Sequence, residues 1–328
     1  MRLRRRYWQV RARRRGGALD CVRDRTAAIR PGAILAMTTL RNERIRLPYF
    51  LDYYRRLGVA HFLMVDNDSD DGSRDWLSRQ PDVSVWHARG SYAGAAFGVD
   101  WTNRLARMHA HRHWLLTVDV DEFLVYPFCD TRPLSALTGW LDAGGIRSFG
   151  AMLLDMYPKG PIGAQPYREG QDPFEIAAWF DSGNLLIERN PDLGNLWIQG
   201  GVRARAFYAD DPYRAPALNK TPLVRWHRDY AYVSSTHALL PRGLNRTFDA
   251  GGGEKTTGAL LHAKFLDTFV ARADEEAARA EHYRGGEEYR RYAGGLDRDA
   301  DLWCKWSERY INWRQLEILG LMSKGNWA

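Results

Sequence analysis

The segment from Trp114 to Pro127, "WLLTVDVDEFLVYP", places three carboxylates between two apolar runs. Short apolar runs bounded by polar residues are typical of buried strands. Asp119, Asp121 and Glu122 repel one another at this spacing, and burying one without a partner costs on the order of several kcal/mol. The segment therefore predicts either an exposed turn at the end of a strand or a site where positive charge meets the acids.

Apolar runs also precede this segment and alternate with helical patterns. Ala33–Leu40, His61–Asp66 and Val83–Ala88 are expected strands. The pattern that contains Pro48 is expected to be a helix ending at Gly58, because proline suits a first helical turn and glycine a helix end. Strands that alternate with helices predict βαβ units, and so an α/β fold with a mostly parallel central sheet flanked by helices.

Polar residues gather where the expected strands end. The motifs are "TTLRNE" after the first strand, "DNDSDDGS" at the end of the second and "DVDE" at the end of the strand that begins at Trp114. Ligands of such sheets bind at the carboxyl ends of the strands. A ligand site is expected at this edge. The second half of the chain is less regular and ends in helical patterns across Lys264–Tyr283, Glu287–Tyr292 and Asp301–Met322.

The composition is that of a globular protein with an unusual start. The chain has 328 residues, of which 45% are hydrophobic and 12% aromatic, enough for a substantial core.

Residues 1–15 contain eight arginines and no acid, so removing these charges from the formal +7 leaves −1 for the rest. This tail is interpreted as a solvated, poorly ordered terminus, as an anchor for anionic lipid with Tyr7 and Trp8 at the interface, or as a nucleic-acid arm, which nothing downstream supports.

Several features bear on location. No apolar segment follows the arginines, which argues against a signal peptide, and no run approaches the roughly 18–20 apolar residues of a membrane span. Cys21, Cys129 and Cys304 show no paired spacing and predict neither a disulfide framework nor a cysteine zinc site. We expect a cytoplasmic protein, with peripheral contact to an anionic membrane through residues 1–15 as an option and without a nucleic-acid partner.

Asp119 and Asp121 stand two residues apart and point the same way if they lie on a strand. Two carboxylates on one side suit Mg²⁺ or Mn²⁺, which are commonly held by one or two carboxylates together with substrate phosphates. The alternative is a turn at a strand end with solvated acids. Glu122 points elsewhere in either interpretation.

The "DNDSDDGS" motif begins like a calcium-binding EF-hand loop. However, the position that requires the downstream glutamate is Leu77, and a strand leads into the loop where an EF-hand has a helix. We therefore interpret the motif as a polar turn. Asp66 would cap the strand end and accept hydrogen bonds from a nucleobase or ribose, while Ser69 and Asp70 hold the turn.

Single histidines and lysines in the second half have two interpretations each. His262 in "GALLHAKFL" is either a structural residue or a neutral imidazole that completes a metal site, and Lys264 can neutralise phosphate. The same ambiguity holds for Lys220, His227 and His237. The glycine pair in "IQGGVRARAF" either allows close approach of a ligand or forms a plain turn.

Taken in order, these motifs resemble the bacterial glycosyltransferase family 2-like enzymes, which have a GT-A fold. The branch is the one with an R-N-E start, D-N-x-S-x-D-G and D-x-D-E-F. The resemblance spans roughly residues 33–322 and includes "LLDMYPKGP", "KTPLVRW", "STHALL" and "EHYRGGEEYRRY". It implies a GT-A catalytic domain (31–265) and a helical C-terminal extension (266–328), and it does not explain the basic tail (1–30) that precedes them. The catalytic domain would divide near residue 130 into a nucleotide-sugar half (31–130) and an acceptor half (131–265).

The resemblance also implies a metal-dependent, inverting transfer of a sugar from a UDP- or GDP-linked donor to a glycan or lipid-linked acceptor, in polysaccharide or glycoconjugate synthesis. Its metal ligands would be Asp119, Asp121 and His262, around Mn²⁺ or Mg²⁺. Its donor-binding residues would be Thr39, Arg41, Asn42, Glu43, Asp66 and Lys264.

The catalytic base is less clearly marked than the donor site. Asp155 in "LLDMYP" is slightly favoured, and Asp211 and Asp181 are alternatives.

Two other functions are considered besides glycosyl transfer. A nucleotidyltransferase would need a glycine-rich phosphate loop, which "TTLRNE" lacks, and a non-catalytic sugar-binding or scaffold protein could keep the same fold.

Overall fold

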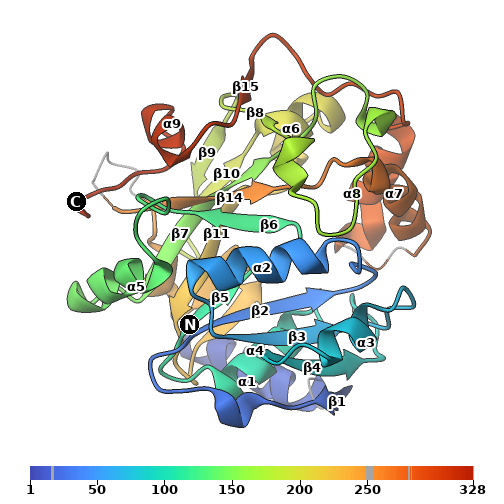
Figure 1. Cartoon of the computed structure of the whole chain (residues 1–328). Coiled ribbons are helices and arrows are strands. Elements are labelled where there is room, and N and C mark those ends of the chain that lie inside the picture. Colours follow the sequence, from blue (N-terminus) through green and yellow to red (C-terminus); the bar gives the residue numbers. More distant parts are fainter. Residues whose placement is uncertain (16–17, 249–254, 280, 282, 328) are drawn as a thin grey trace.

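The computed structural model covers residues 1–328 and describes all of them except 16–17, 249–254, 280, 282 and 328. At the centre of the described part lies a nine-stranded sheet with the strand order β1-β4-β3-β2-β5-β11-β7-β14-β6 (Figure 1). Its strands are β1 (Leu19–Arg23), β2 (Ile34–Leu40), β3 (His61–Asp66), β4 (Val83–Ala88), β5 (Trp114–Thr117), β6 (Glu122–Val125), β7 (Ser148–Asp155), β11 (Asn219–Arg225) and β14 (Gly258–His262). Three small sheets pair β8 (Trp179–Asp181) with β15 (Ser307–Arg309), β9 (Leu186–Arg189) with β10 (Leu196–Gln199), and β12 (Ala231–Ser234) with β13 (Ala238–Leu240).

Most strands of the central sheet run in one direction. β2 is parallel to β3 and β5, β3 is parallel to β4, and β7 is parallel to β14. β11 lies antiparallel between β5 and β7, so these two strands also point the same way. Only the edge strands β1 and β6 and the central β11 run against the rest among the strands described. The expected α/β class with a mostly parallel sheet is confirmed.

Helices cover both faces of the sheet, because successive residues of a strand point to opposite sides. Ile34 and Ala36 of β2 pack in one core with α2, whereas Leu35 and Met37 pack in another with α4. α1 joins the second core through Trp8. The helices are α1 (Arg2–Arg15), α2 (Leu47–Leu57), α3 (Ser73–Ser78), α4 (Val99–His109), α5 (Leu134–Ala143), α6 (Gly201–Phe207), α7 (Asp267–Arg279), α8 (Tyr283–Gly295) and α9 (Trp313–Ile318).

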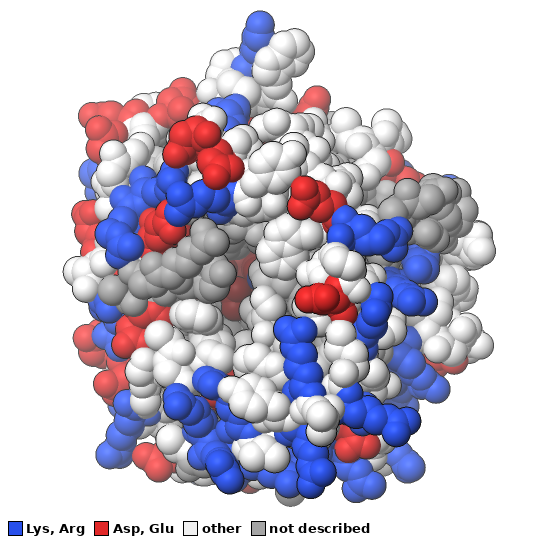
Figure 2. Space-filling model, turned by 180° about the vertical axis from the view of Figure 1, so that it is seen from behind, with Lys and Arg blue, Asp and Glu red and all other residues white. Residues whose placement is uncertain are grey.

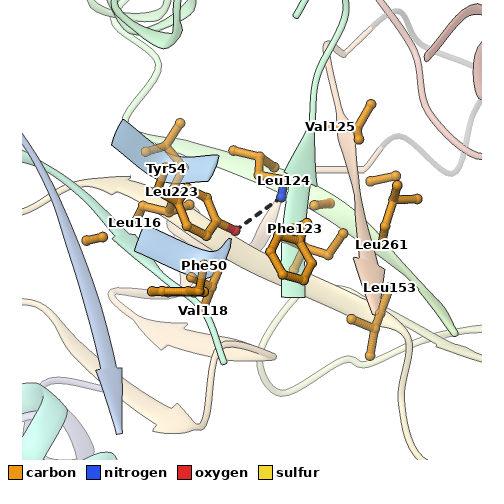
Figure 3. Packing of buried hydrophobic residues seen from close by; sticks show 14 of the residues in the cluster. Phe50, Tyr54, Leu116, Val118, Phe123, Leu124, Val125, Leu153, Leu223 and Leu261 are labelled. Atoms are coloured by element: carbon orange, nitrogen blue, oxygen red, sulfur yellow. Dashed lines mark hydrogen bonds between the residues drawn. The ribbon is translucent and has the colours of Figure 1, made fainter. Parts of the chain in front are cut away.

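The strand that follows the three acids is fixed to α2 by an aromatic cluster (Figure 3). Phe50 and Tyr54 of α2 are fully buried, and both rings pack against Phe123 of β6. The Tyr54 hydroxyl donates to the Glu122 carbonyl at 2.7 Å and accepts from the Leu124 N–H at 3.1 Å. The cluster therefore sets where the backbone of the acidic turn ends.

Changing Tyr54 to phenylalanine tests this anchor. The variant keeps the ring but leaves the buried Glu122 carbonyl and Leu124 N–H without the hydroxyl, and leaving a buried polar group unsatisfied costs about 1–3 kcal/mol. We expect the free energy of unfolding, measured by urea denaturation, to fall by that amount. An unchanged value would mean that the hydroxyl contributes nothing to the position of the turn.

The arginine-rich start is an ordered part of the fold, so its interpretation as a poorly ordered terminus is wrong. Residues 2–15 form α1, and residues 19–23, which the sequence places in the tail, form the edge strand β1. α1 packs against α4, and Arg11 reaches the buried Asp100 of that helix with Nε–O distances of 3.0 and 2.9 Å. Figure 2 shows Lys and Arg side chains gathered over the lower part of the back face, where α1 and α4 lie. Contact of this surface with an anionic membrane stays a prediction.

The C-terminal region is helical only in part. α7 and α8 occupy the positions expected from the sequence, but the helix expected across Asp301–Met322 is wrong. Residues 307–309 instead form β15, whose backbone pairs with β8, and Asn312 then caps the short helix α9 by accepting from two N–H groups. None of the helices in the described residues is long and apolar enough to cross a membrane.

Candidate functional site

A polar cavity of about 240 Å³ lies at the edge of the sheet where the parallel strands end. Thr39 and Leu40 come from the end of β2, Asn67 follows β3, and residues 119–122 follow β5. His262 ends β14, and Lys220 lies at the start of the antiparallel β11, which brings its amino end to the same edge. The strand order thus brings the polar motifs of the sequence into one cavity.

The positive charge that the acidic turn requires is supplied within the chain by Lys220. Its ammonium group pairs with the buried Glu122 carboxylate and lies 3.6 Å from Asp119 Oδ2. Burial alone would lower the pKa of Lys220, but Glu122 and Asp119 raise it above its ordinary value, so the lysine is charged. Glu122 Oε2 also accepts from the Asp119 N–H at 3.2 Å. Glu122 therefore holds the turn and its cation.

Asp121 belongs to a second charged chain that runs into the core. His262 Nε2 lies 3.3 Å from Asp121 Oδ2, and Nδ1 of the same ring lies 2.6 Å from Asp155 Oδ1. Arg203 Nε in turn donates to Asp155 Oδ2 at 2.7 Å. Burial opposes these charges, but Asp121 and Asp155 raise the pKa of His262 to about 9, and Arg203 and His262 lower the pKa of Asp155 to about 2. Two carboxylates and two cations thus alternate along the chain.

The expected metal ligands are brought together only in part. Asp121 and His262 face each other, whereas the Asp119 carboxylate is directed to Lys220. Within the described residues, no group of three or more His, Cys, Asp or Glu side chains is arranged to hold a metal ion. The pair fits part of a site if a metal ion displaces the proton that His262 Nε2 holds towards Asp121, because a metal-binding imidazole must be neutral. Asp155 already holds the far ring nitrogen, as carboxylates beside metal-bound histidines do. Substrate phosphates commonly complete such a set.

Three of the expected donor-binding residues at the end of β2 and in the loop after it line the cavity, namely Thr39, Arg41 and Glu43. Glu43 is buried and pairs with Arg46 at 3.1 Å and with Arg272 of α7. This carboxylate therefore ties the loop after β2 to a helix that is more than two hundred residues away in sequence. The Thr39 hydroxyl is buried without a hydrogen-bond partner.

Asn42 and Asp66, which were also expected to bind the donor, do not line this cavity. Asn42 adopts a left-handed conformation, with φ of 52°, and accepts from the Asp70 N–H at 3.0 Å. Asp66 is completely buried and accepts from the Ser69 N–H at 3.2 Å and from Arg74 at 3.4 Å. Both side chains hold the "DNDSDDGS" turn, and a role in base recognition stays a prediction.

Lys264 lines the cavity from the segment after β14. Its ammonium group lies over the rings of Phe269, Tyr289 and Tyr292 at 5.0–5.3 Å and 3.7 Å from Glu288 Oε1. α7 and α8 supply further lining residues that sequence reasoning missed. They are Arg272, Glu276, Arg279, Glu288 and Tyr289. The one signal for Glu288 and Tyr289 was the "EHYRGGEEYRRY" motif of the resemblance, which does not reach the three residues of α7.

None of the three candidate bases opens into the cavity. Asp155 has both oxygens occupied by His262 and Arg203. Asp181 accepts from Arg205 at 2.9 and 3.1 Å and from the Tyr157 hydroxyl. Asp211 lies on a loop before the short helix at Pro212–Arg214 and lines neither this cavity nor the next. The position of Asp155 suits orientation of the His262 ring.

A second cavity of about 540 Å³ adjoins the first and is more aromatic. Asp119, Lys220, His237 and Glu288 are among the residues that line both cavities, so the two cavities are neighbours and these side chains lie where they meet. His237 donates from Nδ1 to the Asn219 carbonyl at 2.7 Å, which leaves the lone pair on Nε2. Burial and Lys220 lower the pKa of this histidine to about 3, so it stays neutral. A reaction between ligands in the two cavities would take place at this junction.

Comparisons with known proteins add little to this geometry. No protein-family model and no curated protein matches the chain. Similar solved structures include mannosyl-3-phosphoglycerate synthase from Rubrobacter xylanophilus, with 16% identity and a TM-score of 0.27, covering 46% of this chain and 49% of that one. Another is a 4-diphosphocytidyl-2C-methyl-D-erythritol synthase, with 16% identity and a TM-score of 0.27, covering 44% and 68%. The chain thus spans about half the length of the first, and both likenesses are too distant to bear on the site.

Proposed function

We propose that this chain is a metal-dependent glycosyltransferase that moves a sugar from a UDP- or GDP-linked donor to the hydroxyl group of a glycan or lipid-linked acceptor. One observation carries the proposal. A charged cavity at the carboxyl ends of the strands lies beside a larger aromatic cavity, with a carboxylate, a lysine and a neutral histidine lining both. Two neighbouring cavities of different chemistry suit two substrates, one anionic and one rich in hydroxyl groups.

The first cavity has the charges that a nucleoside diphosphate needs. Four cationic side chains that line it now pair with carboxylates of the chain and would exchange these for phosphate oxygens, and they are Arg41, Lys264, Arg272 and Arg279. Arginine and lysine are the usual phosphate-binding residues. Asp121 and His262 would hold the Mn²⁺ or Mg²⁺ ion, which supplies neutralisation of the negative charge that grows on the leaving diphosphate.

In the transfer step, an oxygen of the acceptor attacks C1 of the donor sugar at the junction of the cavities. The bond between C1 and the phosphate oxygen breaks, and the nucleoside diphosphate leaves with the electron pair. The proton of the acceptor hydroxyl must pass to a base within hydrogen-bond reach. In the described part of the chain, two carboxylates line both cavities, those of Asp119 and Glu288. They replace Asp155 and Asp211 as candidates for this role.

A panel of UDP- and GDP-sugars tests the function. With Mn²⁺ present, we expect the wild-type chain to release UDP or GDP and free sugar slowly from one donor, with water acting in place of the acceptor, and chelation by EDTA should stop the release. Chromatography of the nucleotides measures both. A nucleotidyltransferase would instead form pyrophosphate from a nucleoside triphosphate and a sugar 1-phosphate. Binding of nucleotide sugars without turnover of any kind would favour a sugar-binding protein and overturn the proposal.

A further inference from the structure

The N-terminal helix α1 is held against α4, beside the second cavity, by an ion pair between the half-buried Arg11 and the buried Asp100. Arg11 contacts both carboxylate oxygens of Asp100, whose side chain is inaccessible to solvent, and its Nη2 donates to the Gly94 carbonyl at 2.9 Å. Ala12, on the same side of the helix, is also buried. Gly94 belongs to the loop that carries Tyr92 and Phe97 into the cavity wall. α1 and this loop are therefore fixed to each other.

Trp8 lies one helical turn before Arg11 and Ala12, so it faces the same way. Its ring packs against the core beneath α4 and against a small cluster that includes Val233 and Leu240. The guanidinium of Arg11 lies over this ring at 5.6 Å. Trp8 also forms part of the wall of the second cavity. The arginine-rich helix thus contributes an aromatic residue to a binding site as well as a basic surface.

The wall of the second cavity combines aromatic rings with hydrogen-bonding groups. Six aromatic residues from distant parts of the chain line it, and they are Trp8, Tyr92, Phe97, Trp197, Tyr208 and Tyr213. Between them lie hydroxyl, carboxylate, ammonium and imidazole groups, which are those of Ser234, Ser235, Asp119, Lys220 and His237. A pyranose ring presents apolar C–H faces and a rim of hydroxyl groups, which match aromatic faces and polar groups respectively. The volume of about 540 Å³ lies within the roughly 300–1,000 Å³ of typical ligand sites.

We propose that the second cavity binds the carbohydrate part of the acceptor and that α1 completes this site, with Trp8 as the residue that controls affinity for the glycan. The inference rests on the proposed function for the identity of the ligand as an acceptor. Trp8 acts by presenting a ring face to the sugar, and Arg11 acts as a positioning residue that keeps α1 in place. The start of the chain is then part of substrate recognition.

An array of immobilised oligosaccharides, probed with the fluorescent full-length protein, tests the proposal. We expect the wild type to bind at least one glycan and Trp8→Ala to lose about tenfold or more in apparent affinity, because truncating a tryptophan that contacts a ligand commonly causes a loss of this size. Trp8→Phe, which keeps a ring, should recover part of the loss. Leu3→Ala, on the same helix with 82% of Leu3 exposed, is the matched control and should bind as the wild type.

Circular dichroism and thermal unfolding show whether each variant is folded. Should Trp8→Ala fail to fold, Trp197→Ala changes the same cavity from β10 and is expected to reduce glycan binding in the same way. Absence of any bound glycan for the wild type, or equal binding by Trp8→Ala and Leu3→Ala, would overturn the proposal. Release of UDP or GDP from the donor panel is measured on the same wild-type sample. Its absence counts against the proposed function, whereas unchanged glycan binding in Trp8→Ala counts against this inference alone.

Discussion

Replacing Asp121 by alanine is expected to lower the turnover of the nucleotide-sugar donor by about a thousandfold or more. Asp121 is the carboxylate of the acidic turn that faces His262, at 3.3 Å, and the two side chains form the pair that would hold the metal ion. A metal ion contributes several kcal/mol of charge stabilisation to such a transition state, and each 1.36 kcal/mol corresponds to a tenfold change in rate. The measurement is release of UDP or GDP at saturating donor and Mn²⁺.

A binding experiment separates this role from a general loss of structure. Isothermal titration with UDP or GDP, with and without Mn²⁺, is expected to show a metal-dependent gain in affinity for the wild type and none for Asp121→Ala. The matched control is Asp52→Ala on α2, because the Asp52 side chain is 59% exposed and lines neither cavity. If Asp121→Ala keeps turnover that Mn²⁺ stimulates, the ion is held elsewhere and the assignment of the pair is wrong.

The sequence was sufficient to predict the edge of the sheet at which the polar motifs gather, because that depends on local patterns. The strands β2, β3 and β4 follow from short apolar runs that alternate with helical patterns, and a parallel arrangement puts their carboxyl ends at one edge. The sequence did not predict that β11 inserts antiparallel between β5 and β7. This insertion pairs segments that are far apart in the chain, and no local pattern specifies which strands become neighbours.

The roles of single side chains were harder to predict for the same reason. Asp155 stands at the end of β7, but its partners are 48 and 107 residues away and turn it towards the core. Asp66 ends β3 and Asn42 follows β2, yet both side chains hold the "DNDSDDGS" turn. A strand end predicts the edge at which a residue lies, whereas the direction of its side chain is decided by long-range partners.

Lys220 shows how such a partner changes the interpretation of the acidic turn. Its sequence context, "NKTPLVRW", gives no signal that it belongs with acids 98 residues earlier, and we expected an external metal ion to offset their repulsion. In the fold, Lys220 offsets Glu122 and Asp119, while His262 offsets Asp121. The turn is thus balanced by charges of the chain itself, and a divalent ion would act mainly on Asp121 and His262.

Replacing Lys220 by methionine is therefore expected to destabilise the protein by about 3–5 kcal/mol, the usual cost of removing one partner from a buried ion pair. The variant leaves the Glu122 carboxylate, which is 1% exposed, without its cation in the core. Urea denaturation measures the loss. Arg56→Met is the matched control, because the Arg56–Asp52 pair has side chains that are 57% and 59% exposed and such surface pairs contribute at most about 1 kcal/mol.

The double variant Lys220→Met with Glu122→Gln shows whether the cost arises from the uncompensated charge or from lost packing. The glutamine is neutral, and its side-chain oxygen can still accept from the Asp119 N–H, as Glu122 Oε2 does at 3.2 Å. We expect it to recover most of the stability that Lys220→Met loses, since replacing both members of a buried pair is far less costly than replacing one. A double variant as unstable as Lys220→Met, or a single variant no less stable than Arg56→Met, would show that Lys220 does not balance the acids. The turn would then depend on a cation from outside the chain, and its stability should rise with added Mn²⁺ in the wild type.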